Sequence, residues 1–462
     1  MSLLRQDVPL PEAWPPPSDR NSVSHVLGII QRRDPIGHRV HTVLAALFLF
    51  TLPLVTAGSA ITFGLLLIYA LIRLPNTWRC YSSLLRVPVL WALAAWIAIT
   101  AVSLTWSDNV SLGADELSAA RVLLLPLLVW PVMSHLQVLL GAALLGVLAQ
   151  NILQAGELIG IVPHDPDDAE NRIAGLLHPI HTGAWTAAAM CWLLAIVMYA
   201  RDRWRWLALV LAIAAAAGAF LAGSRGPWLA AGAAVPLVIL TALVRRHKAS
   251  RPAIALAVSG VVGLAVAWPI VNETVEQRFN AAMTHYHDAV DQQTYDTSVG
   301  SRIAMWTWAW TMFADSPVGG VGAGAYHHTA REQPTYQAAI ERDPNAEVWF
   351  KDHAHSTYLH TLATTGAVGG AALLAAIVFL LMQAGPMRIS EPWSHGTLFV
   401  VIGWLIGAQF DCYHLNSHLF GLFALAVTAS IAIRPNVEPV AFRLSMPRSV
   451  NSDPTAQEPA KT

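Results

Sequence analysis

The sequence has few charged residues and almost no cysteine. Only 12% of its 462 residues are Asp, Glu, Lys or Arg, about half the usual share in soluble domains, so an ordinary soluble globular protein is excluded. The three cysteines, Cys80, Cys191 and Cys412, are scattered and form no CxxC pair, so we predict neither a disulfide framework nor a thiolate metal site. The polar, proline-rich first 40 residues lack a compact apolar segment followed by a cleavage site, so we expect no cleaved signal peptide.

Hydrophobic residues are what the chain has in excess, at 55%. They recur in apolar runs of about 17–25 residues, the length of a helix that crosses a bilayer. Stretches such as LALVLAIAAAAGAFLAG do not alternate between apolar and polar residues, as the strands of a membrane barrel would. We therefore predict an all-α polytopic membrane protein.

Twelve membrane-spanning helices are expected. They lie near residues 41–56, 57–73, 87–106, 121–135, 138–158, 179–199, 204–222, 227–244, 252–272, 356–382, 393–410 and 414–433. The predicted organisation is an N-terminal segment (1–40), helices one to nine (41–272), a large loop with short interfacial helices (273–355), helices ten to twelve (356–433) and a polar tail (434–462).

The distribution of charge predicts the orientation of these helices. If both termini are cytoplasmic, 20 of the 28 Lys and Arg residues fall inside, whereas 20 of the 29 acidic residues fall outside. This arrangement obeys the positive-inside rule. The eight cations left on the outer side run against the rule and therefore invite a functional explanation: Arg121, Arg172, Arg225, Arg278, Arg302, Arg331, Arg342 and Lys351.

The large outer loop contains a helical stretch and a glycine-rich stretch. SRIAMWTWAWTMFADS (301–316) is apolar on nearly every side and too short to span, so we expect its three tryptophans to lie in the headgroup layer. PVGGVGAG (317–324) follows, and glycines there permit tight turns and close approach to a ligand.

Three of the outer arginines are candidates for binding a diphosphate. Arg225 lies in the turn LAGSRGPW, Arg302 lies at the start of the 301–316 helix, and Arg172 lies just before the sixth span. Helix N-termini favour anions, and guanidinium groups match phosphate geometry. The alternative is that each arginine pairs with an outer acid or extends its side chain to lipid phosphates.

His353 and His355 stand directly before the tenth span, in KDHAHSTYLH. Three roles are open: exposed loop histidines, metal ligands, or a general base, since imidazole titrates near neutral pH. Metal binding would need further ligands, such as His327, His328, His285 or His287, but no HExxH spacing is present. Asp352 or Asp411 is a candidate for orienting the basic imidazole.

The segment from His355 onward resembles a known family. His355-Ser356, nine residues, Gly366, two residues and Gly369 resemble the signature of bacterial O-antigen ligases. The stretches AGSRGPWLA, GSRIAMWTWAW and RIAGLLHPIHTGAW are also similar to segments of the wider O-antigen ligase and polymerase superfamily.

This resemblance implies a GT-C-like fold in the bacterial inner membrane and a periplasmic active site. It implies transfer of O-antigen from undecaprenyl diphosphate to a sugar hydroxyl of lipid A–core, with inversion and without a metal. By the motif, His355 is the expected base, and Arg225, Arg302 and, less directly, Arg172 are expected to bind the diphosphate. No cofactor or nucleic-acid partner is expected; membrane lipids surround the chain.

Three other functions compete with ligation. An O-antigen polymerase uses the same donor, and a protein O-oligosaccharyltransferase uses a Ser or Thr acceptor. The His-Ser form of the motif and the short stretch after the last span favour the ligase. A transporter or lipid flippase predicts charges near the membrane midplane and paired broken helices, whereas here the polar residues collect at one face.

Overall fold

The computed structural model describes residues 23–164, 172–199, 203–245, 276–277, 280–291, 294–385 and 392–432, and every regular element in these ranges is helical. The expected all-α architecture is therefore confirmed. The expected span at 252–272 and most of both terminal segments lie outside the described residues.

The helices of the first half alternate long apolar elements with short 3-10 turns. They are α1 (Val23–Arg33), α2 (Pro35–Thr51), α3 (Thr56–Thr77), η1 (Trp78–Arg86), α4 (Pro88–Ser103), η2 (Leu104–Trp106), α5 (Val110–Ser118), η3 (Ala119–Leu124), α6 (Leu125–Val129), η4 (Trp130–His135) and α7 (Leu136–Leu158).

The second half contains the remaining long helices and a group of short outer ones. They are α8 (Pro179–Tyr199), α9 (Trp204–Leu221), α10 (Arg225–Arg245), a helix over 280–291, α12 (Gly300–Asp315), α13 (Tyr326–Glu332), α14 (Pro334–Arg342), η5 (Pro344–Trp349), α15 (Thr357–Ala384), α16 (Pro392–Gly407), η7 (Tyr413–Leu415) and α17 (Ser417–Ala432).

Six helical stretches among the described residues are long and apolar enough to cross a membrane. They are Thr56–Arg86, Pro88–Trp106, Val110–Leu158, Pro179–Tyr199, Trp204–Leu221 and Thr357–Ala384. Arg225–Thr241 and Ser417–Ala432 are apolar but shorter. These helices support a multi-pass membrane protein, while the total of twelve spans stays a prediction.

The expected span at 121–135 is not one continuous helix. It divides into η3, α6 and η4, and the φ/ψ angles of Val132 are not helical. Proline removes a backbone donor and clashes with the preceding turn, so Pro126 and Pro131 explain why the geometry changes here.

The bundle is built around α17. Almost every residue of α17 is buried, and the helix packs against α16, α15, α8, α6 and η3. Around it, α8 packs on α9, α10 and α16, while α15 packs on α4. Trp404 and Phe423 pack against each other at this centre, with ring planes tilted by 40° and ring centroids 4.5 Å apart.

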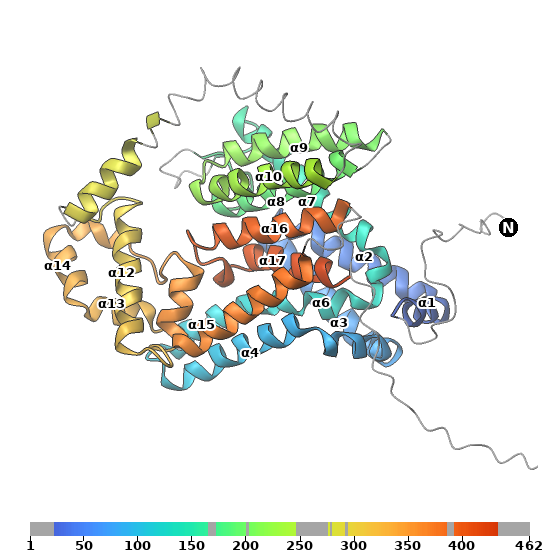
Figure 1. Cartoon of the computed structure of the whole chain (residues 1–462), viewed down its shortest axis with the longest axis horizontal. Helices are drawn as coiled ribbons and strands as arrows, with labels where there is room; N and C mark the ends of the chain where they lie inside the picture. Colours follow the sequence, from blue (N-terminus) through green and yellow to red (C-terminus); the bar gives the residue numbers. More distant parts are fainter. Residues whose placement is uncertain are drawn as a thin grey trace, which may run out of the picture.

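A second, smaller core lies in the outer group of helices. Trp308 of α12 packs edge-on against Phe350 and beside Tyr336. Figure 1 shows α12 running across the direction of α4, α10 and α16, at the end of the bundle away from α1. This direction agrees with a helix that lies along a membrane surface.

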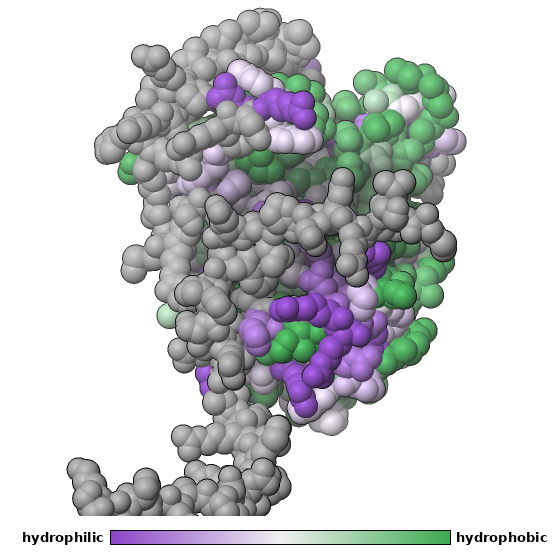
Figure 2. All heavy atoms as spheres, turned by 90° about the vertical axis from the view of Figure 1, so that its right-hand side faces the viewer, coloured by the Kyte–Doolittle hydropathy of each residue, from purple (hydrophilic) through white to green (hydrophobic). Residues whose placement is uncertain are grey.

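The opposite end of the bundle carries α1 and the start of α2. Arg32, Arg33 and Arg39 are exposed there, and hydrophilic side chains gather on this end beside strongly hydrophobic ones (Figure 2). These three of the basic residues expected on the cytoplasmic side thus lie at the end of the bundle away from α12, and the orientation of the chain in the membrane stays a prediction.

The glycine-rich segment is docked into a break in α15. Gly366 has φ 61° and ψ −162° in the middle of this helix. The backbone N–H groups of Val321 and Gly322 donate to the carbonyls of Ala363 and Thr364, both at 2.9 Å, and Ala367 N–H donates to Pro317 O at 2.7 Å. The break therefore fixes α12, which carries Arg302, relative to α15, which follows His355.

Replacing Gly366 by alanine is expected to lower stability by on the order of 2 kcal/mol, because positive φ is strained for residues with a Cβ. The Cβ would also lie 2.3 Å from the backbone oxygen of Val318. Thermal unfolding in detergent measures the effect. Gly141→Ala in α7 is the matched control, since nothing lies within 4 Å of its Cβ. Equal melting temperatures for the two variants would contradict this account.

Candidate active site

His355 stands at the junction between the outer loop and α15. Ser356 caps this helix by accepting a hydrogen bond from Leu359 N–H at 3.3 Å. Among the described residues, His355 is the one non-glycine residue with positive φ, at 46°. Such backbone strain persists only where the surroundings hold it, and it is frequent at functional sites.

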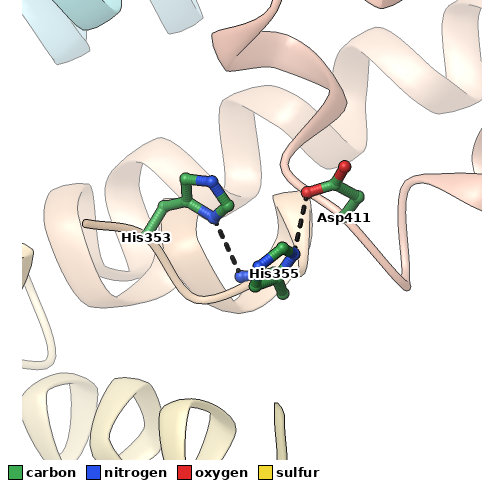
Figure 3. A group of neighbouring side chains, drawn as sticks. All are labelled: His353, His355 and Asp411. Atoms are coloured by element: carbon green, nitrogen blue, oxygen red, sulfur yellow. Dashed lines mark hydrogen bonds and ion pairs between the residues drawn. The ribbon is translucent and has the colours of Figure 1, made fainter. Parts of the chain in front are cut away.

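Asp411 holds the imidazole of His355. The Nδ1 atom of His355 lies 3.0 Å from Asp411 Oδ1, and both side chains are largely buried, at 14% and 15% exposed. Asp411 lies after α16, and its Oδ1 also accepts the N–H of Cys412 at 2.8 Å. Figure 3 shows the carboxylate and the imidazole pointing toward one another.

The surroundings keep Asp411 ionised. Burial by itself would raise the pKa of this carboxyl, but the hydrogen bond and electrostatic interaction with the His355 imidazole and the hydrogen bond from the N–H of Cys412 hold the pKa well below its usual value. A carboxylate only accepts hydrogen bonds, so Nδ1 of His355 carries the proton. In the neutral form of this imidazole the lone pair lies on Nε2, which is the arrangement a general base requires.

His353 supports the backbone beside this pair. Its Nδ1 accepts the backbone N–H of His355 at 3.2 Å, and the two rings meet edge to face with centroids 4.6 Å apart. Burial, followed by the charge of His355, lowers the pKa of His353 to about 3. This imidazole is therefore neutral at physiological pH and adds no charge to the site.

Asp352, the other carboxylate considered for His355, has a different partner. It pairs with Nδ1 of His327 on α13, and its side chain is 59% exposed. The structure thus assigns the orienting contact to Asp411, which lies 56 residues from His355 in the sequence.

One group of side chains among the described residues has the geometry of a metal site. The potential ligand atoms of His353, His355 and Asp411 all lie within 4.8 Å of one another, and two imidazoles with one carboxylate are a known donor set for divalent metals. The other histidines considered as ligands are not part of this group. His327 pairs with Asp352, His328 is near Asp108 and Glu332, and His287 is near Asp291.

A cavity of about 310 Å³ brings the three candidate arginines together. Its polar lining contains Arg172, Ser224, Arg225, Ser298, Arg302 and Asp411. Its apolar lining includes Ile180, Leu229, Ile303, Trp306 and Phe410. The cavity therefore combines a cationic part with an apolar part, and Asp411 connects it to His355.

Arg225 and Arg302 meet at one residue of the loop. Arg225 Nη1 donates to the hydroxyl of Ser298 at 3.1 Å, and Arg302 Nη1 donates to the carbonyl of Ser298. The buried Nε of Arg225 has no hydrogen-bond partner among the described residues, and Arg225 makes no ion pair with a described carboxylate. The guanidinium group of Arg225 therefore has N–H donors that can bind an anionic ligand.

The tryptophans of α12 differ from the sequence expectation. Trp308 is only 2% exposed and fills the second core, and Trp306 lines the cavity. Trp310 is 57% exposed, so it is the one of the three that keeps most of its surface free for the expected contact with a headgroup layer. Sequence reasoning missed the place of Trp306 in the cavity, although its spacing of four residues from Arg302 puts both on one helix face.

The comparisons with known proteins concern the central part of the chain. Residues 210–374 match a family model described as O-antigen ligase. A protein of Haemophilus influenzae described as uncharacterized is 26% identical over 158 residues, which are 34% of this chain and 38% of that protein. The family match contains Arg225, Arg302, His355 and Gly366, and it supports membership of the chain in the O-antigen ligase superfamily.

Proposed function

We propose that the protein is an O-antigen ligase of the bacterial inner membrane. It moves O-antigen polysaccharide from undecaprenyl diphosphate to a sugar hydroxyl of lipid A–core on the periplasmic face. Twelve spans, a GT-C-like arrangement and cytoplasmic termini belong to the same proposal. The observation that carries it is the His355–Asp411 pair next to a cavity lined by three arginines.

The proposed reaction is a single displacement at the anomeric carbon. The acceptor hydroxyl gives its proton to Nε2 of His355 while its oxygen forms the new glycosidic bond. The bond between the anomeric carbon and the diphosphate oxygen breaks, and undecaprenyl diphosphate leaves with the electron pair. Attack from the opposite side inverts the anomeric configuration.

The arginines supply the electrostatic part of the catalysis. Negative charge increases on the leaving diphosphate, and fixed positive groups in a partly dehydrated cavity stabilise it. Arg225 and Arg302 are proposed as the direct ligands, with Arg172 on the same wall. The apolar lining suits the first part of the isoprenoid chain.

Product analysis of a reconstituted reaction tests the function. The purified chain is incubated with lipid-linked glycan, with and without rough lipopolysaccharide. The proposal predicts glycan attached to lipopolysaccharide when this acceptor is present. Without the acceptor, the lipid-linked glycan should not be elongated. Longer lipid-linked glycan would indicate a polymerase, glycan on Ser or Thr of an added protein would indicate an oligosaccharyltransferase, and movement of intact donor across vesicles without transfer would indicate a flippase.

Chelation of divalent cations tests the proposed use of arginines instead of a metal. We expect the transfer rate with EDTA to equal the rate without it, because guanidinium groups cannot be removed by a chelator. The assay is run on protein dialysed against EDTA, with Mg²⁺, Mn²⁺ or Zn²⁺ added back. A loss that one of these ions restores would instead assign His353, His355 and Asp411 a metal-binding role.

A further inference from the structure

Trp306 lies between the proposed diphosphate site and the proposed base. Arg302 and Trp306 are four residues apart on α12, so they share a helix face, and both line the cavity. On its other side, the indole N–H of Trp306 donates to the backbone oxygen of His355 at 3.4 Å. A group bound next to the indole is therefore close both to Arg302 in the proposed diphosphate site and to His355, the proposed base.

The bonding of the donor places a particular group there. The first sugar is attached directly to the diphosphate, and its anomeric carbon must meet a hydroxyl whose proton goes to His355. With the diphosphate at Arg302, this sugar falls between Arg302 and His355. An aromatic ring has an electron-rich face, and a pyranose has a face of polarised C–H groups that packs well against it.

The other tryptophans of α12 cannot take this position. Trp308 is 2% exposed inside the second core, and Trp310 is 57% exposed. Neither belongs to the lining of the cavity. Trp306, which is partly buried, is thus the one indole of α12 available to a ligand in the cavity.

We propose that the indole of Trp306 is the platform on which the first sugar of the lipid-linked donor stacks, and that it favours pyranoses with a continuous C–H face. This inference rests on the proposed function, because it requires the diphosphate at Arg225 and Arg302. It assigns the donor sugar a subsite that is separate from the binding of the diphosphate and the lipid.

Binding of two synthetic probes tests the inference. One is a short-chain polyprenyl diphosphate that carries a single hexose, and the other is the same polyprenyl diphosphate without sugar. W306A in the full-length chain should weaken binding of the hexose-bearing probe about five- to tenfold, the worth of one aromatic stack. Binding of the sugar-free probe should stay within about twofold of the wild-type value. W310A is the matched control and should change neither.

Equal weakening of both probes by W306A, or weakening of neither, would overturn the inference. If W306A does not give folded protein, W306L is compared in the same way and is judged by the same two outcomes. R302Q separates this inference from the proposed function. It should weaken both probes, and unchanged binding of the sugar-free probe to R302Q would overturn the proposed diphosphate site itself, whatever W306A does.

Discussion

His355→Ala is expected to reduce glycan transfer at least about a thousandfold, the upper range for loss of a positioned general base. Without the imidazole, no neutral group is held by Asp411 to take the proton of the acceptor hydroxyl. The initial rate of transfer to rough lipopolysaccharide by purified protein measures the effect. Donor binding should change little, since the arginines remain.

The matched control is His328→Ala. This histidine lies on α13 of the same outer group of helices, and its side chain is 57% exposed. The control should transfer glycan at the wild-type rate and insert normally. If His355→Ala keeps more than a small fraction of wild-type activity while it is folded in the membrane, His355 is not the base.

Arg225→Ala and Arg302→Ala are expected to have the next largest effect, each lowering the rate of transfer about a hundredfold or more. Removal of one preorganised donor to a developing negative charge has this magnitude. Because both guanidinium groups meet at Ser298, the double variant should lose less than the product of the two single losses, as coupled neighbours do.

Kinetics with varied donor and varied acceptor separate the proposed roles. The KM for the donor should rise and kcat should fall, whereas the KM for rough lipopolysaccharide should stay near its wild-type value. Arg331→Ala is the control, since this arginine on α13 is 54% exposed and pairs with Glu347. A larger change in the KM for rough lipopolysaccharide than in the KM for the donor would instead assign the arginines to binding of the acceptor.

The long helices are predictable from the sequence because apolar runs of membrane length have a single economical conformation. The predicted span at 179–199 coincides with α8 (Pro179–Tyr199). The sequence predicts less accurately where a helix is interrupted, because local backbone geometry determines the interruption. The division of 121–135 depends on prolines within an apolar run, and the break of α15 at Gly366 depends on a loop that docks from elsewhere in the chain.

The candidate site was predictable in its residues but not in its contacts. Charges on the outer side and a family motif indicated His355 and the arginines. The pairing of Asp411 with His355 joins residues 56 positions apart, and only the return of the chain after α16 brings them together. The place of Trp306 in the cavity likewise depends on which face of α12 meets the bundle. Composition alone gave all three tryptophans of this helix the same expected position.

The central claim is that one outer cavity holds the diphosphate of the donor beside His355. Photo-cross-linking tests it most directly, with a polyprenyl diphosphate that carries a photoreactive group next to the phosphates and with adducts mapped by mass spectrometry. The account predicts adducts in the first turns of α10 and α12 and in residues 407–413, all of which contribute to the cavity lining. These adducts should disappear when unlabelled polyprenyl diphosphate is in excess. The claim would be contradicted if the adducts that unlabelled polyprenyl diphosphate suppresses were concentrated around α1 and η4, at the other end of the bundle.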